Sequence, residues 1–169
     1  MGISKYKPIN SLSADWYTDD KFLKKEINQI FLKSWLLIGP EAQISNPGDC
    51  LFQSIVDQPI VCVRQEDNSI KTFFNICRHR AGSFENKKSK NNYLVCKYHG
   101  WTYSINGQLK SPRGFNKSEI AVEELCLKYI NTKIWKGLIF INFCDKPNSF
   151  GTTFNDVEKV LAPYKLENF

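Results

Sequence analysis

Two short segments of this sequence each carry one cysteine and one histidine, side chains that often bind transition metals. The first is Cys77-Arg78-His79 and the second is Cys96-Lys97-Tyr98-His99, with 16 residues between His79 and Cys96. Thiolate and imidazole ligands suit iron–sulfur clusters as well as zinc. These are the only two histidines in the sequence, so their pairing with cysteine in both segments is hard to attribute to chance. The pattern predicts a metal centre with four protein ligands.

Two kinds of metal centre fit this ligand set. A [2Fe–2S] cluster takes two protein ligands on each iron, and replacing two thiolates by neutral imidazoles on one iron raises the reduction potential. Structural zinc is the alternative, since two cysteines and two histidines also satisfy tetrahedral Zn²⁺. Zinc motifs commonly keep about two to four residues between paired ligands, whereas the first pair here is separated by one residue and both pairs mix thiolate with imidazole. We therefore predict the iron–sulfur cluster.

The elements that position these ligands read mainly as β-strands. Short runs of apolar and β-branched residues are separated by turn signals, and the dipeptide Asn106-Gly107 predicts a tight hairpin turn soon after the second ligand pair. Gly137 is expected to be a bulge or a close-packing point within the last strand. The predicted strands cover residues 51–56, 59–64, 70–76, 101–105, 108–110, 125–130 and 134–143. The pattern indicates an antiparallel β fold.

A helix is predicted on each side of this β region. Acidic residues at positions 19 and 20 can cap an amphipathic surface helix, and apolar residues follow them at helical spacing. Near the other end, apolar residues over 154–161 predict a short helix that Pro163 ends. The apolar residues of the first helix are Leu23, Ile27, Ile30 and Phe31.

Composition sets broad limits on the class of protein. The 169 residues are 42% hydrophobic and 24% charged, which is typical of one globular domain. No stretch approaches the roughly 18 consecutive apolar residues of a membrane span, and the first residues lack the apolar core of a signal peptide. We expect a cytoplasmic protein with no membrane contact. Four further cysteines beside apolar runs are expected to have no functional role, namely Cys50, Cys62, Cys126 and Cys144.

The net charge of +6 is concentrated around the ligands. Residues 78–113 hold eight basic residues and one acid, Glu85, whereas the rest of the chain holds 15 basic and 16 acidic residues. A solvated lysine-rich loop is the plainest interpretation, and no nucleic-acid-binding motif accompanies the charge. An acidic electron-transfer partner is the favoured interpretation, because opposite potentials steer encounter. The basic residues are Arg78, Arg80, Lys87, Lys88, Lys90, Lys97, Lys110 and Arg113.

The two ligand segments resemble those of a known family. Residues 75–80 (Asn-Ile-Cys-Arg-His-Arg) and 96–103 (Cys-Lys-Tyr-His-Gly-Trp-Thr-Tyr) are similar to the two Rieske loops of ring-hydroxylating oxygenase α subunits. The flanking regions resemble the family more loosely, at Trp16–Trp35 and at Pro47-Gly48-Asp49. Ser111-Pro112-Arg113-Gly114 is similar to the family's proline-bearing loop, which implies that it shields the cluster.

The resemblance implies a fold, a domain organisation and a role. The fold would be a mainly antiparallel β Rieske-type fold with cluster loops at 77–82 and 96–101. It would divide into an N-terminal arm and helix (1–36), a Rieske [2Fe–2S] domain (37–148) and a C-terminal helix (149–169). Cys77 and Cys96 would bind the inner iron, and His79 and His99 the outer iron. The chain would pass single electrons from a reductase or ferredoxin to a mononuclear Fe(II).

In the family, that mononuclear iron lies in a catalytic oxygenase domain and is bound by two histidines and a carboxylate. Both histidines of this chain are already assigned, and the chain ends at Phe169. We therefore expect no catalytic residues here and no complete oxygenase from this chain alone; a homo-oligomer is possible. The alternative is a standalone Rieske ferredoxin, although such ferredoxins usually lack the N-terminal helix and the extension at 154–161.

The residues after His99 bear on the reduction potential. Respiratory Rieske proteins have a serine after the His-Gly pair that donates a hydrogen bond to a bridging sulfide, and Trp101 occupies that position here. Tyr103 matches their tyrosine donor. Because hydrogen bonds to the sulfurs raise the potential, the loss of one donor predicts a value near the lower end of the roughly −150 to +300 mV Rieske range.

Overall fold

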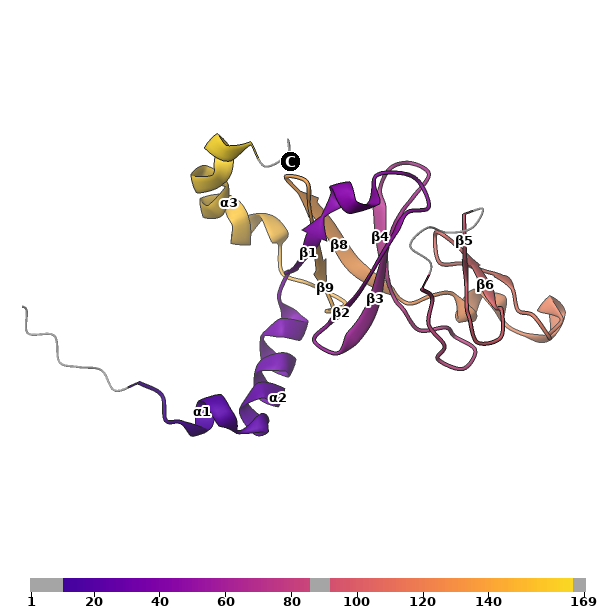
Figure 1. The fold of residues 1–169 in the computed structure, drawn as a ribbon, viewed down its shortest axis with the longest axis horizontal. Coiled ribbons are helices and arrows are strands. Elements are labelled where there is room, and N and C mark those ends of the chain that lie inside the picture. The colour runs from indigo at the N-terminus through magenta and orange to yellow at the C-terminus, as the bar shows by residue number, and fades with distance from the viewer. Residues whose placement is uncertain (1–10, 86–91, 166–169) are drawn as a thin grey trace, which may run out of the picture.

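The computed structural model describes residues 11–85 and 92–165, and antiparallel β-strands dominate them (Figure 1). The larger sheet has six strands in the order β1-β9-β8-β4-β3-β2, and the smaller sheet has three in the order β5-β6-β7. The larger sheet comprises β1 (Leu36–Pro40), β2 (Cys50–Ile55), β3 (Gln58–Arg64), β4 (Ile70–Phe74), β8 (Tyr129–Trp135) and β9 (Leu138–Asn142). The smaller comprises β5 (Tyr93–Val95), β6 (Thr102–Ser104) and β7 (Leu109–Ser111). The predicted mainly antiparallel fold is confirmed.

The three described α-helices lie at the end of the molecule away from the smaller sheet (Figure 1). They are α1 (Asp15–Thr18), α2 (Asp20–Gln29) and α3 (Phe150–Leu161). Short 3₁₀ helices span Phe31–Lys33, Glu41–Ile44, Lys117–Glu119, Val122–Leu125 and Ala162–Tyr164. None of the described helices is long and apolar enough to cross a membrane.

Strand β3, which lies beside the edge strand β2, is buried on both faces and separates two hydrophobic cores. Successive side chains of a strand point to opposite faces of the sheet, so Val61 and Val63 enter one core while Ile60 and Cys62 enter the other. The first, which we call the inter-sheet core, also contains Leu94, Tyr103 and Leu109 of the smaller sheet. This core therefore joins the two sheets beneath the predicted ligands.

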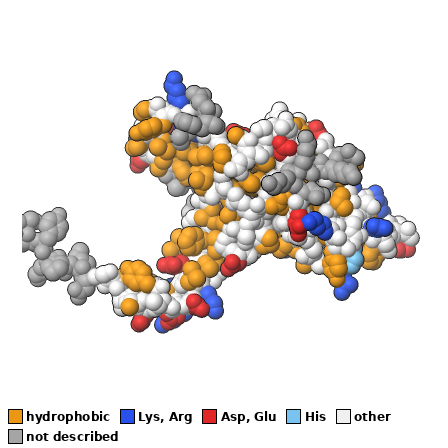
Figure 2. Space-filling view, viewed as in Figure 1, with side chains coloured by type: hydrophobic (Ala, Val, Ile, Leu, Met, Phe, Trp, Pro, Cys, Tyr) orange, Lys and Arg blue, Asp and Glu red, His pale blue; other side chains and the backbone are white. Residues whose placement is uncertain are grey.

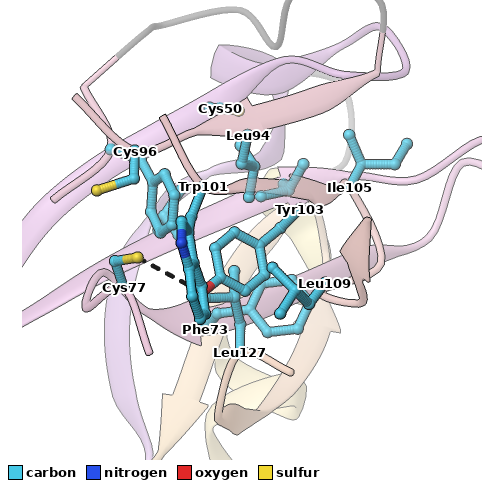
Figure 3. Close-up of a cluster of buried hydrophobic side chains, with 13 residues drawn as sticks. Cys50, Phe73, Cys77, Leu94, Cys96, Trp101, Tyr103, Ile105, Leu109 and Leu127 are labelled. Atoms are coloured by element: carbon cyan, nitrogen blue, oxygen red, sulfur yellow. Dashed lines mark hydrogen bonds between the residues drawn. The ribbon is translucent and has the colours of Figure 1, made fainter. Parts of the chain in front are cut away.

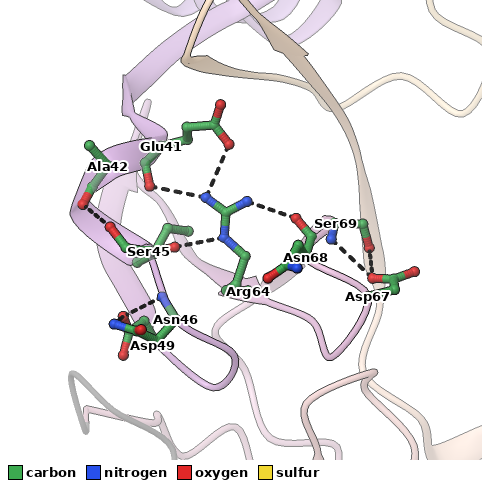
Figure 4. Close-up of polar contacts among 10 residues, drawn as sticks. Glu41, Ala42, Ser45, Asn46, Asp49, Arg64, Asp67, Asn68 and Ser69 are labelled. Atoms are coloured by element: carbon green, nitrogen blue, oxygen red, sulfur yellow. Dashed lines mark hydrogen bonds and ion pairs between the residues drawn. The ribbon is translucent and has the colours of Figure 1, made fainter. Parts of the chain in front are cut away.

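A buried arginine holds the end of β3 against the preceding 3₁₀ helix (Figure 4). The Arg64 guanidinium donates to the backbone carbonyls of Ile44 at 2.7 Å, Asn68 at 2.7 Å and Glu41 at 3.2 Å. It also forms an ion pair with the Glu41 carboxylate at 3.0 Å. These contacts satisfy the buried charge and fix the β3–β4 turn relative to residues 41–44.

The sequence correctly predicted the β2–β3–β4 meander and the hairpin at Asn106-Gly107, but the last strand prediction was wrong. The predicted strand over 134–143 is divided between β8 and β9 by a two-residue turn in which Lys136 and Gly137 have φ values of +47° and +75°. Gly137 is thus a turn residue rather than a bulge. A lysine with positive φ is uncommon, which is why the residue types did not reveal this turn.

Other boundaries also differ from the sequence-based predictions. The predicted strand over 125–130 is mostly irregular, because Leu127 contributes to the inter-sheet core and its N–H bonds to the Gly107 carbonyl at 2.8 Å. Strands β1 and β5 were not predicted, since both are short and β1 pairs with the distant β9. The turn predicted at residues 57–58 instead lies at Val56 and Asp57, whose φ values are positive.

The flanking helices were predicted with shifted limits. Asp19 caps α2 by accepting a hydrogen bond from the Lys21 N–H at 2.9 Å, but the α-helix ends at Gln29 and a 3₁₀ turn follows. The C-terminal helix begins at Phe150, four residues earlier than predicted, and Pro163 lies in the 3₁₀ turn after it. No residue of α2 is buried, and Figure 2 shows apolar side chains exposed along α2 and α3.

Candidate metal centre

Two loops at the end of the molecule opposite the helices carry the predicted ligands. The first loop follows β4 and is closed by hydrogen bonds from Cys77 N–H to the Gly82 carbonyl (2.7 Å) and from Ala81 N–H to the Cys77 carbonyl (3.0 Å). The second connects β5 to β6 and is closed in the same way between Cys96 and Trp101 (2.9 Å) and between Gly100 and Cys96 (3.0 Å). Both loops are therefore compact turns that begin at a cysteine.

The two thiols lie at the inner end of the site. Cys77 and Cys96 are 2% and 3% exposed and both belong to the inter-sheet core (Figure 3). Burial raises the pKa of the Cys77 thiol, while a hydrogen bond with Tyr103 opposes this shift. A buried thiolate needs a compensating positive charge, and a metal ion bound to these sulfurs would supply one.

The two histidines lie nearer the surface, and their rings are in contact. The His79 and His99 ring centroids are 4.8 Å apart in an edge-to-face arrangement, and both residues are partly exposed. Figure 2 shows a histidine side chain reaching the surface at this end of the molecule. Desolvation, His99 and the positive charge of Arg80 all lower the pKa of His79. This favours the neutral imidazole, the form that binds a metal.

An unpaired atom on the second histidine shows that these residues fit a metal centre. His99 Nδ1 is buried and has no hydrogen-bond partner in the described part of the chain. Buried nitrogens are rarely left unpaired, and an imidazole nitrogen that binds a metal needs no other partner. Together with two buried thiols of adjacent loops, this atom gives the donor set of a thiolate–imidazole iron–sulfur cluster.

Tyr103 connects the first loop to the smaller sheet. Its hydroxyl lies 3.4 Å from Cys77 Sγ and accepts a hydrogen bond from the Arg78 N–H at 3.1 Å (Figure 3). Burial and the neighbouring Cys77 both raise the pKa of Tyr103, so the hydroxyl keeps its proton. A hydroxyl that keeps its proton can donate it to the Cys77 sulfur whenever that sulfur is a thiolate, which has no proton to donate.

Aromatic side chains cover the histidine end of the site. Trp101 stacks on His79 at 4.6 Å with 9° between the planes, and Phe115 meets the edges of both rings at 5.7 and 5.8 Å. Tyr98 stacks on His99 at 3.8 Å while remaining 60% exposed. Phe115 follows the loop predicted to shield the cluster, in which Pro112 is buried.

The charged residues around the site are exposed. Lys97 forms an ion pair with Glu85, and its backbone N–H bonds to the Ser83 carbonyl at 3.4 Å, which links the two loops. The basic residues of this segment that are described are all exposed, namely Arg78, Arg80, Lys97, Lys110 and Arg113. The other three that the sequence identified lie outside the described residues, at Lys87, Lys88 and Lys90. We call the five exposed residues the basic rim.

The described residues do not form a second kind of metal site, one that holds a single ion. Among the described residues, no three His, Cys, Asp or Glu side chains converge on a single ion. A cluster in which each iron takes two protein ligands does not require such a group. The four remaining cysteines form no disulfide among the described residues, and burial raises the pKa of Cys62 to about 11.

A glycine permits the close approach of the two loops, which sequence reasoning did not identify. A Cβ atom on Gly82 would lie 2.8 Å from Cys96 Sγ and 2.9 Å from Tyr98 Cβ, well inside van der Waals contact.

We expect Gly82→Ala to lower the iron and sulfide content of purified protein to less than about half, because the loops must separate. Iron and sulfide assays test this, with Gly151→Ala on α3 as a control, because a Cβ there meets nothing within 4 Å and the backbone needs no positive φ. Equal occupancy of Gly82→Ala and the unaltered chain would contradict it.

Comparison with known proteins identifies the family of this chain. The family model described as Rieske [2Fe–2S] domain matches residues 34–124. The glycine betaine monooxygenase oxygenase subunit of Pseudomonas aeruginosa is 31% identical over 159 residues, covering 94% of this chain and 37% of that protein. The benzene 1,2-dioxygenase subunit alpha of Pseudomonas putida is 36% identical over 138 residues, covering 75% of this chain and 29% of that protein. The chain thus spans about a third of the length of these relatives.

Solved structures show the same fold. The crystal structure of the quaternary ammonium Rieske monooxygenase CntA with L-carnitine superimposes with a TM-score of 0.83 at 23% identity, over 90% of this chain and 45% of that one. Naphthalene 1,2-dioxygenase with bound indole gives a TM-score of 0.79 at 27% identity, over 87% and 34%.

The fold and the two loops define a β protein whose paired cysteine–histidine loops fit an iron–sulfur cluster. The chain belongs to the Rieske [2Fe–2S] domain family. Within it, the chain is a Rieske domain of the oxygenase α-subunit type, and its role is the relay of single electrons.

Proposed function

We propose that Cys77, His79, Cys96 and His99 bind the [2Fe–2S] cluster, and that the chain relays one electron at a time to the mononuclear iron of a catalytic oxygenase domain. When bound, the cluster supplies a one-electron redox couple. The observation that carries the proposal is the meeting of two buried thiols and two contacting imidazoles, one of each from each loop. The unpaired His99 Nδ1 supports it.

The positions of the four proposed ligands support different roles for the cysteine end and the histidine end of the site. Cys77 and Cys96 would hold the inner iron, since both sulfurs lie in the inter-sheet core. The partly exposed His79 and His99 would hold the outer iron, nearest to an approaching partner. The Tyr103 hydroxyl would donate to the Cys77 thiolate, and Trp101 and Phe115 would exclude water from the imidazole side.

The catalytic iron would be bound by residues outside this sequence, because both of its histidines are proposed cluster ligands. We propose the domain limits given above: arm and helix over 1–36, Rieske domain over 37–148 and C-terminal helix over 149–169. The similarity to an oxygenase subunit over 94% of the chain includes the flanking helices. This favours an oxygenase component over a standalone ferredoxin. The cytoplasmic location stays a prediction.

The electron donor would be a reductase or ferredoxin with an acidic surface that meets the basic rim.

Arg113 lies on the loop beside Phe115, so Arg113→Glu is expected to slow reduction by an acidic plant-type ferredoxin about tenfold at low salt. The difference should fall away at high ionic strength because salt screens exposed charges. Stopped-flow reduction at several salt concentrations measures this effect. Lys133→Glu, an equal change of charge on β8, is the control, and equal rates for the two variants would count against steering by the rim.

Low-temperature EPR of the purified chain tests the proposed cluster directly. Before dithionite the sample should be silent, and afterwards it should show a rhombic signal of low average g. Iron and acid-labile sulfide assayed on the same sample should give two of each per chain. One zinc per chain without sulfide, in protein purified without oxygen, would contradict the proposed electron-transfer role. The site would then be a structural zinc site.

A further inference from the structure

Two buried side-chain polar atoms in the described part of the chain lack a hydrogen-bond partner, His99 Nδ1 and Trp101 Nε1. Under the proposed function the first is a ligand atom. The second needs a different explanation, because an indole N–H is a donor only and does not bind metals in this form. Leaving a buried donor unpaired costs folding free energy, so an acceptor at this position would remove a real penalty.

The surroundings of Trp101 indicate where that acceptor lies. The side chain is 3% exposed and belongs to the same core as Cys77 and Cys96. Its ring stacks on the His79 imidazole at 4.6 Å, and Phe115 lies perpendicular to both rings, 5.8 Å from the Trp101 ring. Figure 3 draws the indole nitrogen on the side of the ring toward the two cysteine sulfurs. The N–H therefore faces the space between the proposed ligands.

We propose that the Trp101 indole N–H donates a hydrogen bond to a bridging sulfide and thereby raises the reduction potential of the cluster. This inference rests on the proposed function. Neither Cys77 Sγ nor Cys96 Sγ accepts from the indole, whose N–H has no partner among the described residues, so we assign a sulfide of the bound cluster as the acceptor. Reduction adds negative charge to the sulfurs, so the hydrogen bond is stronger in the reduced state and favours it. From the sequence, position 101 was expected to lack the hydrogen-bond donor that a serine hydroxyl provides in respiratory Rieske proteins. The indole N–H of Trp101 would provide a donor in its place.

Replacement by phenylalanine keeps an aromatic ring on His79 and removes the N–H. We expect Trp101→Phe to lower the equilibrium constant for one-electron reduction about tenfold, which corresponds to about 59 mV. EPR-monitored redox titration measures this shift. Phe115→Leu is the control, since it loosens the aromatic cover but keeps the indole. An unchanged potential in Trp101→Phe, or an equal shift in Phe115→Leu, would overturn the inference.

A second measurement uses the unaltered protein and so does not depend on the variant assembling its cluster. The chain has four tryptophans, and in the described residues only Trp101 shares a core with the proposed thiols. Protein grown with indole-¹⁵N tryptophan should show a ¹⁵N coupling in the electron–nuclear double resonance of the reduced cluster. An intact rhombic signal without that coupling would overturn the inference alone. Absence of any such signal, with no iron or sulfide bound, would overturn the proposed function as well.

Discussion

Cys77→Ala and Cys96→Ala should each yield protein with less than about a tenth of the iron and sulfide of the unaltered chain. Thiolates are the strongest iron ligands at this site, and each variant leaves one iron with a single protein ligand. Both sulfurs are buried, so water cannot easily take the place of the missing thiolate. The rhombic EPR signal should disappear with the metal.

The control for this experiment is Cys126→Ala. Cys126 is likewise a partly buried thiol in no disulfide, and its sulfur bonds to the Val122 carbonyl at 3.8 Å, away from the proposed ligands. This variant should retain two irons and two sulfides per chain. Far-UV circular dichroism on all three variants separates loss of the cluster from loss of the fold. Full iron content in either Cys77→Ala or Cys96→Ala would remove that residue from the ligand set.

Phe73→Ala should lower the free energy of unfolding by about 3–5 kcal/mol, the usual cost of a large cavity in a core. Phe73 is 2% exposed and lies on β4, just before the first ligand loop. Its ring packs on Tyr129 at 6.2 Å and fills the space where a Cβ of Gly107 would lie, at 2.6 Å. It therefore ties the larger sheet to the hairpin of the smaller one, and cluster occupancy should fall with stability.

Denaturant unfolding of the cluster-loaded protein measures this effect, and the melting temperature should fall by on the order of 10 °C. Phe31→Ala provides the comparison, because Phe31 is 40% exposed and its loss should cost less than about 1 kcal/mol. If Phe73→Ala were as stable as Phe31→Ala, the contact between Phe73 and the Gly107 turn would not join the sheets in solution.

The candidate site could be predicted from the sequence better than the boundaries of the helices and strands. Metal ligands are recognised by their residue types and by short spacings along the chain. The Cys-His pairs could therefore be identified without knowing any long-range contact. The structure brings the four residues together, while their assignment as ligands stays a prediction. Gly82, in contrast, gave no signal, because its role depends on a loop that begins fourteen residues later in the sequence.

The sequence by itself predicted the two cysteine–histidine loops, the β2–β3–β4 meander and the hairpin turn at Asn106-Gly107. Each of these depends on local geometry or on metal chemistry. Only the tertiary structure decided the pairing of β1 with β9, the turn at Lys136-Gly137 and the stacking of Trp101 on His79 beside Phe115. These features depend on contacts between segments far apart in the chain, and packing there outweighs local preference.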